Sequence, residues 1–308
     1  PEEIIVGGVY GNGQFRLAAI DPAQLTFTHI TDAAAVESPL AVDTSLTEVY
    51  WNSLNGQPLP ATLQEAREYA DRLGEERYGV TILLSAQAQE ACDAVWDATI
   101  TTTDQWPLED EPHAIARMLE ALDRTLALYP DGFFRQMKNT MGEGGVRFMP
   151  VGHIENAVNA IGLTYETYGW QNIYIDVTID AFDGTICHEI WHAIEGVLLT
   201  RNWDAINQEE WAACNPAGFS YNEDAETPDS NPERWTFFYE FSAQDVYFVD
   251  AYSRTNAKED RARIMEYIMA TEDVAGALVQ SPAIAQKLQI MCRAIRENFD
   301  TSSWGELR

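Results

Sequence analysis

The chain is poor in positive charge. Of its 308 residues only 19 are Lys or Arg, against 49 Asp and Glu, which gives a formal net charge of -30. Nucleic acids and anionic membranes bind cationic surfaces, so a chain of this charge repels both. The sequence therefore excludes a nucleic-acid partner. The acidic surface is expected to keep the protein in solution, with the attraction of basic substrates as the alternative.

Long apolar runs are also missing. No stretch approaches the ~20 consecutive apolar residues that a membrane-spanning helix needs, and the chain is expected to contain no such segment. The residues that follow Pro1 lack the basic and apolar regions of a signal peptide, and there is no initiator Met. We interpret the N-terminus as mature or trimmed, so a targeting signal encoded by the gene would not be visible.

Cysteine is scarce and widely spaced. The four cysteines, Cys92, Cys187, Cys214 and Cys292, form no CxxC pair. This spacing argues against a zinc site built from thiolates. Four cysteines in 308 residues are also too few for a scaffold held by disulfides. One or two disulfide bonds stay open at this point, and so does the oligomeric state.

What is present predicts a folded α+β protein. Hydrophobic residues make up 46% of the chain and aromatic residues 11%, enough for a buried core. Helical spacing predicts helices over residues 61–76, 112–129, 182–199, 233–251, 256–270 and 282–298. Apolar runs predict strands over 78–84, 146–151 and 173–179, with Pro150 placing the second at an edge or bulge. We expect a strand-prone extension over 1–59, then an upper half with a sheet (60–200) and a lower helical half (201–308).

The strongest functional signal is a pair of histidines, His188 and His192, separated by four positions on the predicted helix 182–199. Side chains at i and i+4 lie on one face of a helix, so both imidazoles can bind one ion. Glu189 lies beside them, where a carboxylate can act as general base toward water. Since the chain has only five histidines, a chance match of this HExxH pattern is rare. A degenerate site that no longer binds metal is the alternative.

Two histidines do not complete a catalytic zinc site, which usually has three protein ligands. No histidine follows His192, so the third ligand is expected to be a carboxylate or, less plausibly, the upstream His153. The carboxylate candidates are Glu195, Asp204, Glu240, Asp245 and Glu259. Glu195 follows His192 by three positions on the same helix, from where it cannot easily complete a tetrahedron. Its expected role is solvent contact or a hydrogen bond.

Glu259 is the preferred third ligand. It begins the predicted helix 256–270, so that a metal would join two halves of the domain. The alternative is structural, because Asn256 and Glu259 match a capping box and Arg263 lies one turn further on. Asp260 has two interpretations, a carboxylate that orients one imidazole or a solvated residue at the start of the helix.

These motifs resemble the zincin metallopeptidases, in particular the gluzincin branch. Tyr252 stands seven residues before Glu259, a spacing similar to that of the anthrax lethal factor catalytic domain. The wider pattern resembles the zinc-binding metallopeptidases of gut Firmicutes, many of them lipoproteins. It consists of Phe248-Val249-Asp250-Ala251-Tyr252-Ser253, Thr255-Asn256, Glu259-Asp260 and Ala262, preceded by Trp211, Asn215-Pro216, Gly218-Phe219 and Tyr221. The resemblance covers residues 60–308.

The resemblance implies a fold and a set of roles. The fold is a twisted sheet above a cleft, with the helix that carries His188 beneath it and a helical lower half. Zn2+ would be bound by both histidines and Glu259, and Tyr252 would donate a hydrogen bond to the oxyanion. Tyr252 as an ordinary core or rim tyrosine is the alternative. Residues 173–179 would form the edge strand along the cleft, and the protein would be extracellular or anchored to the cell surface.

The sequence therefore predicts a zinc-dependent hydrolase, most plausibly a peptidase, that acts on peptides or proteins with Glu189 as general base. Two other classes stay open. One is a surface or binding protein that keeps the zincin shell without catalysis, and the other is a metal-dependent hydrolase of a different substrate. The acidic segment 222–232 would either cover the cleft or form a mobile solvated loop. The substrate itself cannot be read from the sequence.

Overall fold

The computed structural model describes residues 4–9, 15–21, 26–32, 60–91, 99–101, 114–155, 160–179, 182–221 and 231–302. The chain divides into two compact units, residues 1–49 and residues 50–308. In the smaller unit, strands β1 (Ile4–Val9), β2 (Phe15–Asp21) and β3 (Thr26–Asp32) form an antiparallel sheet in the order β1-β2-β3. The strand-prone character expected for this part of the sequence agrees with these strands.

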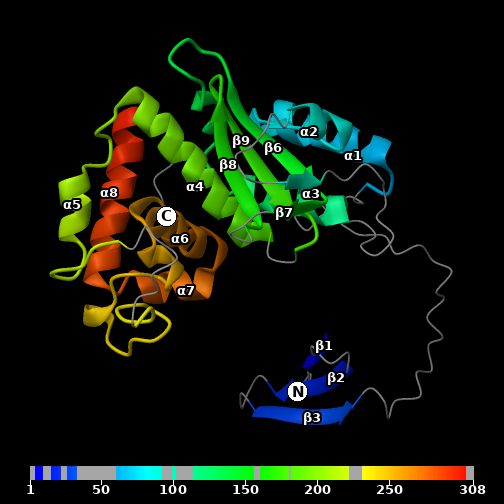
Figure 1. Ribbon diagram of the computed structural model, residues 1–308. Helices are drawn as coiled ribbons and strands as arrows, with labels where there is room; N and C mark the ends of the chain where they lie inside the picture. The colour runs from blue at the N-terminus through cyan, green and yellow to red at the C-terminus, as the bar shows by residue number, and fades with distance from the viewer. Residues whose placement is uncertain are drawn as a thin grey trace. The chain divides into compact units, whose positions relative to one another are not determined.

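The larger unit contains a mixed sheet in the order β4-β6-β9-β8 (Figure 1). Strands β4 (Thr81–Ile82), β6 (Gly145–Val151) and β9 (Trp170–Asp176) are parallel, and β8 (Gly162–Thr167) runs antiparallel to β9. A small separate ladder pairs β5 (Thr99–Thr101) with β7 (His153–Glu155). Pro150 lies inside β6, which is paired on both sides, whereas the sequence predicts an edge or a bulge. The strand β4 pairs only with Arg147 and Phe148 of β6, so Pro150, which has no N–H, interrupts no hydrogen bond of the β4–β6 ladder.

The prediction that 173–179 forms the edge strand is wrong. That segment belongs to β9, which is paired on both sides, by β6 and by β8. Among the described strands, the one at the edge of the sheet beyond β9 is β8, which the sequence analysis missed. Tyr168 and Gly169 connect β8 to β9 and both have positive φ values, 50° and 84°, as a two-residue hairpin turn requires. This turn allows the chain to add one antiparallel strand beyond β9.

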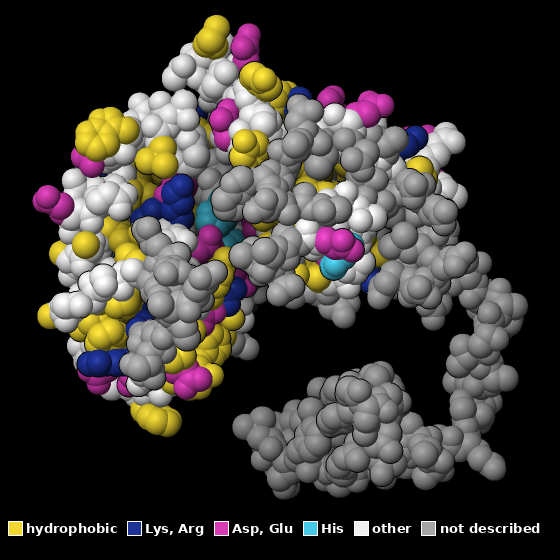
Figure 2. Space-filling view, viewed as in Figure 1, with side chains coloured by type: hydrophobic (Ala, Val, Ile, Leu, Met, Phe, Trp, Pro, Cys, Tyr) yellow, Lys and Arg dark blue, Asp and Glu magenta, His cyan; other side chains and the backbone are white. Residues whose placement is uncertain are grey.

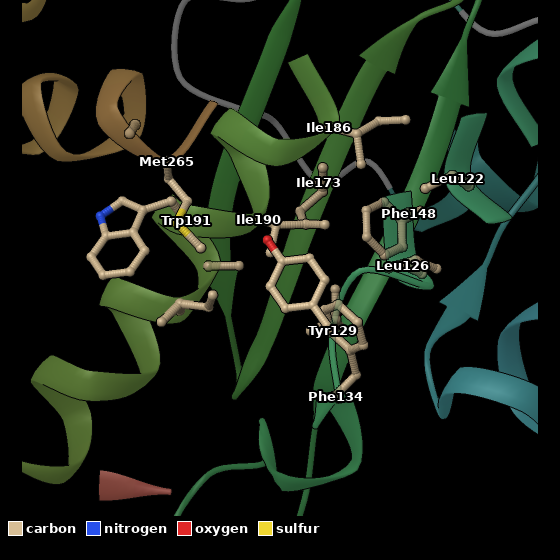
Figure 3. Packing of buried hydrophobic residues seen from close by; sticks show 14 of the residues in the cluster. Leu122, Leu126, Tyr129, Phe134, Phe148, Ile173, Ile186, Ile190, Trp191 and Met265 are labelled. Atoms are coloured by element: carbon tan, nitrogen blue, oxygen red, sulfur yellow. The ribbon is translucent and has the colours of Figure 1, made fainter. Parts of the chain in front are cut away.

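One face of the sheet carries the main hydrophobic core. Helices α1 (Leu63–Asp71) and α3 (Ala114–Leu126) pack there together with α4 (Phe182–Arg201), while α2 (Ala86–Ala91) covers a smaller cluster on the other face. Figure 3 shows Leu122 and Leu126 of α3 and Ile186 of α4 around Phe148 of β6, with Ile190 of α4 next to Ile173 of β9. Complete burial of such a side chain contributes roughly 1.5–3 kcal/mol. The predicted helix 61–76 corresponds to α1 and to a π-helix that continues it over Arg72–Tyr78. Of the predicted strand 78–84, only Thr81–Ile82 forms a strand, β4.

Helix α4 lies between the sheet and the C-terminal helices (Figure 1). Its apolar side chains point in every direction, with Ile186, Cys187, Ile190, Trp191 and Ala193 all fully buried. A helix that is apolar all round is expected where it is covered on every side. Buried polar groups on such a helix are costly without partners, so His188 and Glu189 in its middle point to a function.

The C-terminal half consists of α5 (Gln208–Ala213), α6 (Ala257–Ala270), α7 (Glu272–Leu278) and α8 (Pro282–Asn298). The predicted helices 256–270 and 282–298 match α6 and α8, whereas the predicted helix 233–251 is wrong. This segment folds back on itself, because main-chain hydrogen bonds join Trp235 to Tyr247 and Phe237 to Phe248. Trp235 has a φ of 64°, which a helix does not allow.

The prediction of an α+β fold with a small sheet and a mainly helical C-terminal half is confirmed. Within the described part of the chain, no helix is long and apolar enough to cross a membrane. Cys187, Cys214 and Cys292 are free thiols, while Cys92 lies outside the described residues. The acidic segment 222–232 also lies almost wholly outside them.

Candidate metal centre

The structure brings His188, His192 and Glu259 together. The distance from Nε2 of His188 to Oε2 of Glu259 is 3.0 Å, and that to Nε2 of His192 is 3.1 Å. Nε2 of His192 lies 3.5 Å from the same carboxylate oxygen. In a tetrahedral zinc site with bonds of about 2.0–2.1 Å, the ligand atoms are about 3.3 Å apart. The three atoms therefore form one face of a tetrahedron that fits this ion, with the fourth position free for water.

The ligand atoms come from two helices. His188 and His192 lie one turn apart on α4, and Glu259 is in the first turn of α6, which packs along α4. Asn256 caps α6 by accepting hydrogen bonds from the backbone N–H groups of Lys258 and Glu259. Half of the predicted capping box is therefore present, but the Glu259 carboxylate faces the histidines instead of the cap. Arg263, its other predicted partner, pairs with Asp250 and Glu266.

The electrostatics of this group favour a cation. Burial would lower the pKa of His188, but hydrogen bonds to Glu259 and Glu266 outweigh this effect and raise the pKa to about 10. Burial would raise the pKa of Glu259, but its hydrogen bonds to His188 and His192 lower the pKa well below the usual range. The pocket thus stabilises a positive charge between these side chains. A divalent metal would meet the same field.

His188, His192 and Glu259 are called the metal group below. The edge strand β8 holds Glu189 beside this group. Its side chain is buried, and its Oε2 accepts a hydrogen bond of 2.7 Å from Oγ1 of Thr164 on β8. Gly162, also on β8, approaches so closely that a Cβ atom there would lie 2.8 Å from the Glu189 carboxyl. Glycine therefore permits this contact, and the edge strand positions the predicted general base.

Glu266 is a functional candidate that the sequence analysis missed. Its Oε2 lies 3.1 Å from Nδ1 of His188, the ring nitrogen opposite the one that faces Glu259. A carboxylate in this place fixes the tautomer and the orientation of a metal-binding imidazole. Glu259, Arg263 and Glu266 follow each other at i, i+4 and i+7 on α6, a spacing that could have identified Glu266 as a residue on the same face.

Replacing Glu266 with Gln is expected to weaken zinc binding by about 10–100-fold. Gln keeps the size of the side chain but loses the charge that holds the Nδ1–H group of His188. The measurement is a competition titration of zinc against a chelator, with circular dichroism as a check on folding. The same change at Glu297, an exposed residue of α8, is the control. Equal zinc affinities for the wild type and both variants would contradict this role of Glu266.

Tyr252 lies at the rim of the metal group. It belongs to a short 3-10 helix (Tyr252–Arg254) just before α6, and its ring centroid is 6.3 Å from that of His188. The side chain is 51% exposed. Burial of part of the ring, followed by the charges of Glu259 and Glu189, raises the pKa of its hydroxyl. The hydroxyl therefore stays protonated and can donate a hydrogen bond toward the metal group, which is the chemistry expected of an oxyanion donor.

The other candidate ligands lie elsewhere. His153 pairs with Asp176, 2.8 Å away at the end of β9. Glu195 is not a solvent contact but a buried partner of Arg261, with Oε1 2.6 Å from the guanidinium. The remaining candidates serve local structure: Asp204 accepts from the Asn207 side chain, Glu240 from the Trp235 N–H, and Asp245 belongs to a 3-10 helix.

Asp260 does not orient an imidazole, and it is not solvated. It is fully buried, and its Oδ2 accepts hydrogen bonds from the Tyr221 hydroxyl, at 2.6 Å, and from Nζ of Lys287, at 2.7 Å. The Tyr221 hydroxyl also accepts from Nε1 of Trp211 at 2.8 Å. Two residues of the motif that carries the family resemblance, Trp211 and Tyr221, thus fix α6 at the position next to Glu259.

A cavity of about 190 Å³ opens beside the metal group and is called the metal-side cavity below. It is lined by Ala160, Ile161, Gly162, Thr185, His188, Glu189, Tyr252, Arg263 and Glu266. Figure 2 shows histidine side chains in a recess near the middle of the described surface, next to acidic side chains. The arrangement combines a metal-binding group, a buried carboxylate, a tyrosine hydroxyl and space for a small substrate group.

Comparisons with known proteins give one distant structural likeness. A crystal structure described as a "putative zinc-binding metallo-peptidase" from Bacteroides caccae superposes with a TM-score of 0.43 and 16% sequence identity. The match covers 78% of this chain and 88% of that chain. No protein-family model matches the sequence, and no curated protein matches it.

Proposed function

We propose that this protein is a zinc-dependent peptidase. The observation that carries the proposal is the spacing of the three ligand atoms of His188, His192 and Glu259, all within 4.8 Å of one another. Together with a buried carboxylate at Glu189, this donor set suits a catalytic zinc with one open position. His and carboxylate ligands without thiolates distinguish it from structural zinc sites, which are commonly rich in cysteine.

The protein side chains divide the chemistry. When bound, zinc supplies a Lewis acid that polarises water and the scissile carbonyl. Glu189 takes the proton of the attacking water and passes it to the leaving amine. Tyr252 donates a hydrogen bond to the oxygen that gains negative charge, a contribution of roughly 3 kcal/mol for one such donor. Thr164 and Glu266 hold Glu189 and His188 in their orientations.

The substrate would bind along β8. In a hairpin with a two-residue turn, the residues that flank the turn form a hydrogen-bonded pair, and such pairs then alternate along the strands. Thr167 and Trp170 flank this turn. Gly162, Thr164 and Glu166 therefore point their main-chain N–H and C=O groups away from β9. An extended peptide that adds to this edge lies beside the metal group, which favours a peptide over other substrates of a hydrolase.

Zinc binding is tested by measuring the zinc content of the dialysed protein with elemental mass spectrometry. Peptide cleavage is tested by mass spectrometry of peptide mixtures incubated with the protein. We expect about one zinc per chain and new peptide termini that disappear on chelation and return with zinc. His192→Ala is expected to lose both the metal and the activity. A wild-type protein that takes up no zinc would overturn the proposal. If the protein binds zinc but cleaves no peptide, the proposal of a peptidase would give way to that of a non-catalytic binding protein.

A further inference from the structure

A second and larger cavity lies on the other side of Tyr252. Its volume is about 490 Å³, within the range of ligand-binding pockets. We call it the aromatic cavity, and it is lined by Pro232, Glu233, Phe238, Tyr239, Asp250, Ala251 and Tyr252. All of these residues lie between α5 and α6 in the sequence. The metal mechanism uses only Tyr252 among them.

Aromatic side chains form the walls of this cavity. Phe238 and Tyr239 are 49% and 54% exposed, which is high for aromatic residues beside a cavity. Phe238 is also fixed in place, because its ring packs edge-on against Phe237 and against Tyr267 of α6, both at 5.6 Å. Hydrophobic side chains show on the surface in this region of Figure 2, at the lower left. Exposed apolar groups that are held rigidly at a concave surface mark a binding site.

The aromatic cavity is connected to the metal centre through shared residues. Tyr252 lines both this cavity and the metal-side cavity. Asp250 lines the aromatic cavity, while its carboxylate accepts a hydrogen bond of 2.9 Å from Nε of Arg263, which lines the metal-side cavity. The two cavities are therefore neighbours on either side of one tyrosine. A bound peptide that occupies the metal-side cavity therefore needs only a short extended stretch of residues to reach the aromatic cavity.

The charges around the aromatic cavity select against acidic ligands. Glu233 and Asp250 are among the lining residues, and no Lys or Arg is. Arg263 neutralises only part of this charge, because it is shared between Asp250 and Glu266. With a net charge of -30 on the whole chain, the surrounding field attracts neutral or basic ligands and repels acidic ones.

We propose that the aromatic cavity is a substrate subsite that binds an aromatic side chain of a peptide, away from the bond that is cleaved. The proposal rests on the proposed peptidase function and adds a specificity to it. An aromatic side chain packs edge-to-face on Phe238 and Tyr239 better than an aliphatic one does. Acidic residues next to the aromatic one are disfavoured by Glu233 and Asp250.

Binding to the zinc-loaded Glu189→Gln protein tests this subsite without relying on catalysis. The probes are unlabelled, N-acetylated and C-amidated hexapeptides of glycine and alanine, with one Phe, with Ala in its place, or with Glu beside the Phe. Isothermal titration calorimetry should show that the Phe peptide binds about tenfold more tightly than the Ala peptide. The Glu-containing peptide should lose most of this gain. Phe238→Ser and Tyr239→Ser, each added to Glu189→Gln, should abolish the preference.

Phe241→Ser provides the matched control. Phe241 is an aromatic residue of the same segment that is fully exposed and does not line the cavity, so its loss should leave the preference unchanged. Equal binding of the Phe and Ala peptides would overturn the subsite, and so would an equal effect of all three Ser variants. Binding with the preference but no cleavage by the wild-type protein would instead overturn the peptidase function and leave the subsite standing.

Discussion

Replacing Glu189 with Gln should abolish peptide hydrolysis while zinc stays bound. Gln has nearly the same shape and can still accept the hydrogen bond from Thr164, which is 2.7 Å from the carboxylate. It cannot take a proton from water, so kcat should fall by about 10²–10⁴-fold, the usual contribution of a general base. The measurement is kcat/KM on a cleaved peptide, with the zinc content determined on the same sample.

The same Glu→Gln change at Glu155 is a suitable control, because this residue is an exposed member of β7. It should retain wild-type activity. If the Glu189 variant binds zinc and keeps its activity within tenfold of the wild type, Glu189 is not the base. Loss of zinc in this variant would show that Glu189 supports the metal group instead of the proton transfer.

Replacing Lys287 with Met should destabilise the protein strongly, although Lys287 does not touch the metal group. Its ammonium is fully buried and donates to Asp260, at 2.7 Å, and to the carbonyl of Tyr247, at 2.9 Å. Burial lowers the pKa of Lys287 and raises that of Asp260, since desolvation outweighs their mutual attraction. Removing one partner leaves a buried charge without its counter-ion, which costs about 3–5 kcal/mol. Urea unfolding measures this loss.

Arg293 offers the comparison on the same helix. It forms an ion pair with Glu210, but the two side chains are 43% and 38% exposed. Arg293→Met should therefore change the free energy of unfolding by less than about 1 kcal/mol. The double variant with Lys287→Met and Asp260→Asn should be more stable than the sum of the two single changes predicts. Equal effects of Lys287→Met and Arg293→Met would contradict the importance of the buried pair.

The proximity of His188 and His192 could be predicted from the sequence because the signals for it are local. His188, Glu189 and His192 have fixed positions on one helix, and the apolar residues around them make that helix certain to be buried. Glu259 needed more, since its distance from the histidines depends on how α6 packs on α4. The resemblance supplied this preference, and the structure brings Glu259 within 3.0 Å of His188.

Other parts could not be predicted because they depend on contacts between distant residues. The segment 233–251 has aromatic residues at helical spacing, yet pairing between its two ends overrides the local preference. The edge strand β8 is half polar and short, and its pairing with β9 is fixed by a turn at Tyr168 and Gly169. Glu266 is one acidic residue among many, and only its distance from His188 sets it apart.

Among the residues that the structure describes, no strand pairs with the outer edge of β8, and this open edge bears on how copies of the protein behave at high concentration. Unpaired main-chain groups on an edge strand invite pairing with any extended strand, including the same edge of a second molecule. Two copies that meet in this way bring together chains that each carry a net charge of -30, and their mutual repulsion opposes the contact. The acidic composition therefore opposes self-association through this edge, the edge along which the proposed substrate would bind.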